Sequence, residues 1–338
     1  MLTKQSSAVT EVISLILVFG LMTSAISAVM LWGTPYMDEK KAEARANSAL
    51  NQLNGISDIL KDDVISQGIN NSSVDVKFTF EYGNLYFNSD GDRFIIYYSL
   101  DSNFDFNVSG LEKSEDDPDD DEFNLIIEED PGDLDELNIS YLYDGSSETK
   151  SPPSGLISAT QGIFDVVRMD IKDSSGIVVG RIWLFDTGSI TYKTSFSQGT
   201  FNVILENGAV VSGKDNNGYL SNKPTIYNRA GLFVMRIIQI KPKFVTSGGT
   251  GKITYKINFK LNESFIREKK ALIPKCLKMQ ISGNDASVIA WKNYFKLNHG
   301  FDIYTENSAK GTIYTNCNKE FTLTHSICNC TMMVEGWK

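Results

Sequence analysis

The chain has 338 residues, a formal net charge of −10 and 41% hydrophobic residues, enough apolar content for one or two packed domains. The charge is uneven, because residues 112–136 hold fourteen Asp or Glu and one Lys. That segment carries −13, so the rest of the chain carries about +3. A basic patch of the kind that binds nucleic acid is absent from the sequence, and we expect no nucleic-acid partner.

The first feature along the chain is a long apolar run. No charged residue occurs from Val12 to Met37, and residues 12–32 form its core. About 20 residues rising about 1.5 Å each cover about 30 Å, so the run is long enough to cross a bilayer as a helix. Glu11 stands at its start, where a carboxylate at the edge of lipid is costly without a partner. The only cation before it is Lys4.

The leader MLTKQS followed by SAVTEVISLILVFG resembles the N-terminus of an archaeal type IV pilin precursor. In that family a dedicated prepilin peptidase removes a short, basic leader before the apolar stretch. The resemblance covers about residues 1–65. It implies a leader of residues 1–6, cleavage between Ser6 and Ser7, and Glu11 as the fifth mature residue, where many pilins have Glu. It also implies that Glu11 and the new amino group of Ser7 act in assembly. The family more often has Gly or Ala at the position of Ser6, and archaellins usually lack the Glu.

Two other interpretations of the run remain open. The first is a single-pass membrane anchor that is never polymerised. The second is an ordinary secretory signal cleaved near Ala25–Ala28, which Glu11 and the barely basic leader disfavour. The positive-inside rule does not settle the orientation, because one basic residue precedes the run and several follow it closely.

Helical composition continues beyond the run, so we expect one long helix over residues 7–66. Pro35 predicts a kink near residues 33–35, and residues 37–65 form an amphipathic part. Its apolar stripe consists of Ala42, Ala46, Ala49, Leu53, Ile56, Leu60 and Val64. The small residues predict close helix–helix contact near Ala42–Ala49, and the larger ones predict docking under a globular head. An amphipathic helix lying on its own domain is the alternative for the larger half.

The pattern then changes to period two, which predicts a first β-rich region over residues 70–150. Its expected strands are Val74–Phe80, Asn84–Phe87, Arg93–Ser99, Phe104–Val108, Phe123–Ile127 and Leu137–Tyr143. The acidic loop 112–136 reads as a solvated, self-repelling segment. A calcium site is the alternative, but the loop lacks the spaced ligands and glycine of a calcium loop, so we predict no metal.

Ser146–Gly155 is the expected linker or long turn, and a second β-rich region follows over residues 156–338. Its expected strands are 163–171, 177–185, 189–196, 201–205, 232–240, 252–261, 311–316, 320–325 and 327–334. One helix is expected at Asn284–Leu297, with Asn284 or Asp285 as its cap. The expected fold class is α+β, with a long N-terminal helix followed by a β-rich, sandwich-like head.

All four cysteines lie in the last quarter of the chain: Cys276, Cys317, Cys328 and Cys330. In an exported chain such a cluster predicts two disulfides. A bridge between Cys328 and Cys330 would be strained, so we expect each to reach back to Cys276 or Cys317, with the pairing open. A four-thiolate zinc site is the alternative, although no C-x-x-C pair is present.

Six sequons follow the helix and favour a glycosylated outward face. Their asparagines are Asn70, Asn71, Asn107, Asn138, Asn262 and Asn329. Asn70 and Asn71 overlap, so we expect one of the two to be used.

The sequence shows no constellation typical of catalysis. His299 and His325 are its only histidines, and no nucleophile elbow, phosphate-binding loop or dinucleotide fingerprint occurs. We therefore expect no enzyme and no cofactor. The pilin resemblance implies a structural subunit of an extracellular pilus, held in the cell membrane before assembly. Its partners would be copies of itself or other pilins, the membrane, the prepilin peptidase and the assembly machinery. The alternative is a non-polymerising surface protein whose β-domain binds a ligand or glycan.

Overall fold

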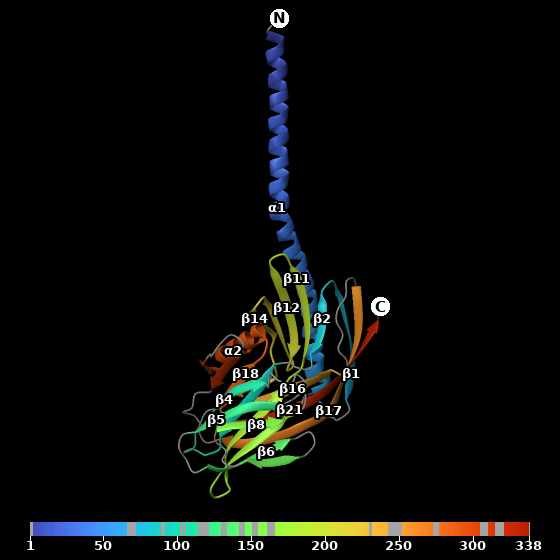
Figure 1. Cartoon of the computed structure of the whole chain (residues 1–338). Helices are drawn as coiled ribbons and strands as arrows, with labels where there is room; N and C mark the ends of the chain where they lie inside the picture. The colour runs from blue at the N-terminus through green and yellow to red at the C-terminus, as the bar shows by residue number, and fades with distance from the viewer. Residues whose placement is uncertain are drawn as a thin grey trace.

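A long N-terminal helix protrudes from a head built almost entirely of β-sheets in the computed structural model of the chain (Figure 1). The structure describes residues 3–65, 72–88, 92–101, 104, 106–113, 122–129, 134–141, 146–150, 155–160, 166–229, 232–242, 252–272, 277–304, 310–314 and 321–337. The expected α+β class is confirmed, with one long helix followed by a strand-rich region.

The helix α1 spans Thr3–Ile59 and continues directly into a π-helical segment, η1, at Leu60–Ile65. It remains continuous through Pro35, which lacks an amide donor and crowds the preceding turn. Figure 1 shows the helix axis changing direction as it reaches the head. The first part of the helix therefore stands outside the head, and the last part runs into it.

Two five-stranded sheets flank the last part of α1. The first has the order β1-β17-β21-β16-β15, with β1 Ser73–Glu81, β17 Lys252–Leu272, β21 Phe321–Trp337, β16 Leu232–Pro242 and β15 Ile226–Arg229. The second has the order β14-β13-β12-β11-β2, with β14 Asn217–Asn222, β13 Ala209–Lys214, β12 Gly199–Glu206, β11 Ser189–Phe196 and β2 Asn84–Asn88. One hydrophobic cluster joins α1 to side chains of both sheets.

An eight-stranded sheet and a three-stranded sheet complete the head. The larger has the order β19-β20-β18-β3-β10-β9-β6-β7, with β19 Asp302–Tyr304, β20 Lys310–Tyr314, β18 Lys278–Ser282, β3 Arg93–Ser99, β10 Val178–Asp186, β9 Val167–Asp173, β6 Leu134–Tyr141 and β7 Ser147–Lys150. The smaller has the order β4-β5-β8, with β4 Phe106–Lys113, β5 Glu122–Glu129 and β8 Gly155–Thr160.

Strand β3 shows why the eight-stranded sheet sits in the middle of the head. Phe94, Ile96 and Tyr98 belong to the hydrophobic cluster that contains the helix α2, Asp285–His299. Ile95 and Tyr97 point the other way, into a cluster that includes residues of β4 and β5. Because both faces are covered, this strand is apolar at almost every position and shows no alternation.

The helix α2 begins at its expected cap and ends at His299, two residues after the expected Leu297. Asn284 has extended backbone angles, and its side-chain Oδ1 accepts a hydrogen bond from the Ala286 N–H at 3.0 Å, so it is the N-cap. Gly300 follows the helix with φ 67°, in the left-handed region that favours glycine at a helix end. Of the two expected caps, Asn284 is the one observed, and Trp291 and Phe295 lie on the buried face of the helix.

The strands also differ from the sequence predictions. Ser146–Gly155 is not simply a linker, because Ser147–Lys150 forms β7 and pairs with β6. The last two expected strands are one strand, β21, which pairs in parallel with β16 and antiparallel with β17. The regions 70–150 and 156–338 contribute strands to common sheets. For example, β3 lies between β18 and β10, and β1 pairs with β17.

Candidate functional site

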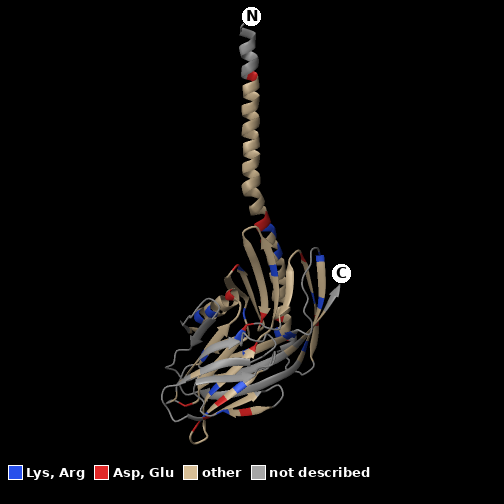
Figure 2. Ribbon diagram, in the orientation of Figure 1, with Lys and Arg blue, Asp and Glu red and all other residues tan. Residues whose placement is uncertain are grey.

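The protruding part of α1 presents an unbroken apolar surface. From Val12 to Met37 every large apolar side chain is exposed, including Leu31 at 74% and Trp32 at 80%. Figure 2 shows no charged residue along this segment between its acidic start and the head. By length and composition the helix can cross a membrane. We call residues 12–37 the apolar span. A surface of this size requires lipid or another protein to cover it.

The second half of the helix packs between the two five-stranded sheets of the head. We call this binding surface of the two sheets the seat. The members of the helix's apolar stripe from Ala42 to Leu60 are buried there, with Leu53 and Leu60 fully inaccessible to solvent. The small residues Ala46 and Ala49 belong to the same cluster, packed with strand residues of both five-stranded sheets. The expectation of helix–helix contact at Ala42–Ala49 is therefore wrong. The alanines let the helix approach the chain's own sheets closely.

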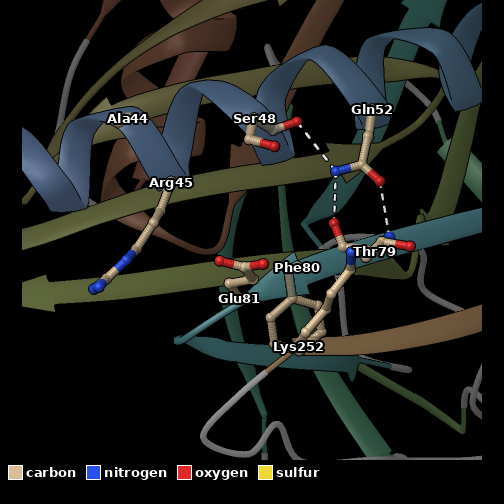
Figure 3. Close-up of a pocket in the computed structure, with 8 residues that line it drawn as sticks. All are labelled: Ala44, Arg45, Ser48, Gln52, Thr79, Phe80, Glu81 and Lys252. Carbon is tan, nitrogen blue, oxygen red and sulfur yellow. Dashed lines mark hydrogen bonds between the residues drawn. The ribbon is translucent and has the colours of Figure 1, made fainter. Parts of the chain in front are cut away.

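Gln52 joins the helix to the edge strand β1. Its side-chain Nε2 donates to the Thr79 carbonyl at 2.7 Å, and its Oε1 accepts from the Thr79 N–H at 2.8 Å (Figure 3). One amide side chain thus replaces the two hydrogen bonds that a neighbouring strand would make. Near it, the Arg45 guanidinium lies 4.6 Å from the centre of the Tyr82 ring.

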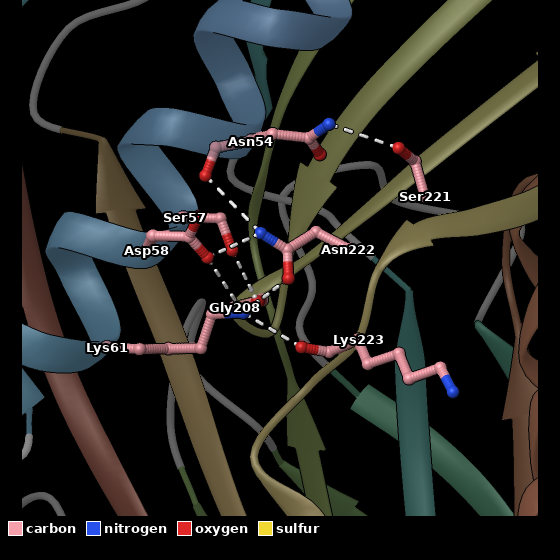
Figure 4. A network of polar contacts seen from close by, with 8 residues as sticks. All are labelled: Asn54, Ser57, Asp58, Lys61, Gly208, Ser221, Asn222 and Lys223. Carbon is pink, nitrogen blue, oxygen red and sulfur yellow. Dashed lines mark hydrogen bonds and ion pairs between the residues drawn. The ribbon is translucent and has the colours of Figure 1, made fainter.

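On the opposite side of the helix, Asn222 of β14 is the centre of a polar network (Figure 4). Its Nδ2 donates to Asp58 Oδ1 at 2.7 Å, and its Oδ1 accepts from Lys61 Nζ at 2.8 Å. Lys61 also donates to the Lys223 carbonyl at 2.8 Å. Burial lowers the pKa of Lys61, while Asp58 acts in the opposite direction. The network therefore fixes the rotation of the helix in its seat.

A close approach at Gly208 completes this side of the seat. The Ser57 hydroxyl donates to the Gly208 carbonyl at 2.8 Å in a buried position. Gly208 has φ 66°, and a Cβ there would lie 2.6 Å from Ile238 Cδ1. Any side chain at this position would be strained by the left-handed backbone and would require the end of the Ile238 side chain to move.

An ion pair marks the point where the helix enters the head. Lys214 Nζ of β13 lies 2.6 Å from Glu39 Oε1 and 4.9 Å from the centre of the Phe196 ring. Both charged side chains are partly exposed, so this pair contributes little to the free energy of unfolding. Its position locates the border between the apolar span and the seat.

A groove with a volume of about 440 Å³ runs beside α1 and β1 (Figure 3). It is lined by Ala44, Arg45, Ser48, Gln52, Thr79, Phe80, Glu81 and Lys252. Its charged groups carry both signs. Within the part of the chain that the structure describes, no three His, Cys, Asp or Glu side chains gather as metal ligands would.

Comparisons with protein-family models, with curated proteins and with solved structures find no match for this chain.

The residues expected to act in processing and assembly all lie on the protruding helix. Ser6 and Ser7 are helical residues of α1 whose side chains lie outside the described set. Glu11 is exposed immediately before the apolar span. The helix thus brings these positions together at its free end, far along its axis from the seat (Figure 1).

The disulfide prediction falls largely outside the described residues. Cys276 and Cys317 are not described, and Cys328 is described only as a position on β21. Cys330, on the same strand, is buried in the cluster that holds α1. The pairing therefore stays a prediction.

The sequons divide in the same way. Asn70 and Asn71 lie outside the described residues, and the side chains of Asn262 and Asn329 are not described. The two remaining amides both accept hydrogen bonds. Asn107 Oδ1 accepts from Lys278 Nζ at 2.7 Å, and Asn138 Oδ1 accepts from Thr149 Oγ1 at 2.6 Å.

Sequence reasoning missed the polar residues of the seat. Gln52, Asn54 and Asp58 flank the apolar stripe on the helix, where polar side chains are ordinary surface residues. Only their partners on β1 and β14 distinguish them, and those partners are distant in sequence.

Proposed function

We propose that this chain is a structural subunit of an extracellular archaeal type IV pilus. In this proposal it is a single-pass membrane protein before assembly. It polymerises through the apolar span with copies of itself or other pilins, and exposes a sandwich-like head at the cell surface.

One observation supports this proposal above the others. The apolar span protrudes entirely free of the head, while residues 46–60 of the same helix pack into it through one hydrophobic cluster. A simple anchor needs no rigid connection to its head. A filament does, because the position of each head must follow from the packing of its helix.

The mechanism follows from the chemistry of the span. Lipid tails and apolar helices are similarly non-polar, so moving the span from the bilayer to a bundle of neighbouring helices changes its partner rather than its polarity. Glu11 would then pair with the free amino group of Ser7, on its own or a neighbouring chain. A carboxylate left without its partner in such a core costs about 3–5 kcal/mol, so the pair would select the correct register.

Electron microscopy of sheared surface material, combined with N-terminal mass spectrometry, tests the proposal. We expect filaments that contain this chain and a mature N-terminus at Ser7. A chain that begins at Met1 would contradict the processing, and one that begins near Ala28 would identify an ordinary signal. Absence of filaments when the maturation and assembly machinery is present would contradict the pilin function.

The Glu11→Ala variant tests the assembly mechanism separately. We expect it to remain in the membrane fraction but to give markedly fewer filaments, because the amino group of Ser7 loses its partner. Glu43→Ala is the matched control, since Glu43 lies on the same helix and pairs with Lys40 only at the surface. Equal filament yields from both variants would remove Glu11 from the mechanism.

The groove beside α1 and β1 favours the second candidate function, a monomeric, membrane-anchored surface protein that binds a ligand or glycan. The groove has the volume of a small-molecule site and contains Arg45, Glu81 and Lys252. Filaments lacking this chain, together with binding of a glycan that Arg45→Ala abolishes, would favour this alternative.

A further inference from the structure

Two buried acids meet where α2 joins the sheets. Asp92 precedes β3 and is 2% exposed, and Glu206 ends β12 and is 1% exposed. The two carboxyl groups interact with each other and with the first turns of α2. Among the described residues neither has a lysine or arginine partner. Burying two like charges without a cation is far too costly, so at least one carboxyl must be protonated.

The hydrogen bonds indicate which carboxyl holds the proton. Glu206 Oε1 accepts from the Ser287 hydroxyl and from the Trp291 indole N–H, the latter at 2.7 Å, as a carboxylate does. Asp92 Oδ1 accepts from the Asn284 N–H at 3.1 Å, but the buried Asp92 Oδ2 has no partner in the described structure. A proton on Oδ2 would satisfy that oxygen by donating to Glu206.

Both acids hold α2 in place. Asp92 binds the backbone of the α2 N-cap through its side chain, and its own carbonyl accepts from the Thr187 N–H at 3.1 Å. Glu206 binds Ser287 and Trp291, on the first and second turns of α2. The pair therefore connects α2 to strands of two different sheets.

The other charged groups nearby have separate partners. Arg93 binds Asp186 with Nε–Oδ1 at 2.8 Å, and Asp285 accepts from Asn216 Nδ2 at 3.0 Å. Burial lowers the pKa of Lys292 on α2, although the charge of Asp285 acts in the opposite direction. Burial, and then the charge of Glu206, raise the pKa of Asp92 well above its usual value, and burial raises the pKa of Glu206.

We propose that Asp92 and Glu206 form a proton-dependent lock, in which one proton on Asp92 Oδ2 is shared with Glu206 and keeps α2 bound to the sheets. Loss of this proton leaves two negative charges buried side by side and loosens α2. The lock is independent of whether the chain polymerises.

The sign of the pH dependence follows from the raised pKa of Asp92. The native state holds a proton that the unfolded chain releases above about pH 4. This contribution to stability is complete in acid and is lost as pH rises through the native pKa. His299 acts in the opposite sense, because burial lowers its pKa. Comparing variants at each pH removes the contribution of His299.

Urea unfolding of the full chain in detergent between pH 5 and 9, followed by tryptophan fluorescence, tests the lock. Asp92→Asn keeps an acceptor for Asn284 and a donor for Glu206 but cannot ionise. As pH rises, we expect the unfolding constant of the wild type to increase by up to about tenfold per pH unit relative to this variant. Asp285→Asn, on the same helix, should follow the wild type. Parallel pH profiles for wild type and Asp92→Asn would overturn the proposal.

Two further measurements keep the test decisive if Asp92→Asn does not fold. Infrared spectroscopy of the wild type at pH 7 should show a protonated-carboxyl C=O band, which the alkaline transition removes. Absence of that band would overturn the lock. Calcium chloride at pH 8 should leave the urea midpoint unchanged. A large increase would mean that a cation, rather than a proton, occupies the site.

Discussion

The two halves of α1 place their apolar side chains in different surroundings. The apolar span is apolar on all sides, and its large side chains are exposed. The seated half has one narrow stripe, buried between two sheets, with polar residues on both sides of it. A surface that is apolar all round accepts any non-polar partner, whereas a stripe with polar flanks specifies one.

The polar contacts explain why the seated half has a single orientation. Gln52 binds β1 on one side, and Asp58 and Lys61 bind Asn222 on the other. In the apolar span, the hydroxyl of Thr23 bonds back to Phe19 and Gly20 of its own helix. The seated half is therefore fixed to the head, whereas the polar contact of Thr23 in the span stays within its own helix.

The largest expected effect is on the seat. Leu53→Ala should lower the free energy of unfolding of the head by about 3–5 kcal/mol, because it removes a fully buried side chain and leaves a cavity. Urea unfolding of the full chain in detergent measures this change. Leu15→Ala is the matched control on the same helix and should leave head stability unchanged, since Leu15 is 73% exposed. Equal losses of unfolding free energy in Leu53→Ala and Leu15→Ala would mean that both halves of α1 pack on the head.

A charge in the middle of the span should act on membrane insertion instead. Leu21→Arg is expected to raise the apparent free energy of insertion by about 3 kcal/mol. An insertion assay that scores translocation of the head measures this change, with Leu21→Phe as the apolar control. The melting temperature of the head should stay the same. A lower melting temperature would show that the span packs on the head.

A smaller effect is expected at the edge of β1. Gln52→Met keeps the length of the side chain but leaves the Thr79 N–H and carbonyl without their partner, which should cost about 1–2 kcal/mol. Amide hydrogen exchange at Thr79 should accelerate. In Gln52→Glu the carboxylate still accepts from the Thr79 N–H, so exchange there should stay slow while stability falls. If amide exchange at Thr79 is unchanged in Gln52→Met, the hydrogen bonds between Gln52 and Thr79 do not hold β1 to the helix.

The sequence predicts the elements whose signals are local. The long helix follows from composition, and α2 follows from Asn284 and the apolar face, both within one short segment. The alanine half of the stripe was misassigned for a physical reason. Small residues permit close approach to a helix and to a sheet equally well, and the pattern does not say which.

The sequence could not predict which strands pair with each other, for a similar reason. Period-two alternation tells which residues share a face but not which strand lies alongside. Strand β3 shows no alternation at all, and its position between β18 and β10 depends on residues nearly two hundred positions away. The acid pair was missed because Asp92 reads as a turn residue, and Glu206 as the end of a strand before Asn207 and Gly208.

The Gln52 side chain also occupies backbone hydrogen-bonding groups of β1 with which another chain could pair. A bare sheet edge is a template on which a second sheet can grow, and molecules crowded at a surface meet edge to edge often. Because Gln52 already binds the N–H and carbonyl of Thr79, an approaching strand cannot pair with that residue. The helix that carries Gln52 also blocks its approach sterically. This edge of the head is therefore less open to strand pairing between copies that lie side by side.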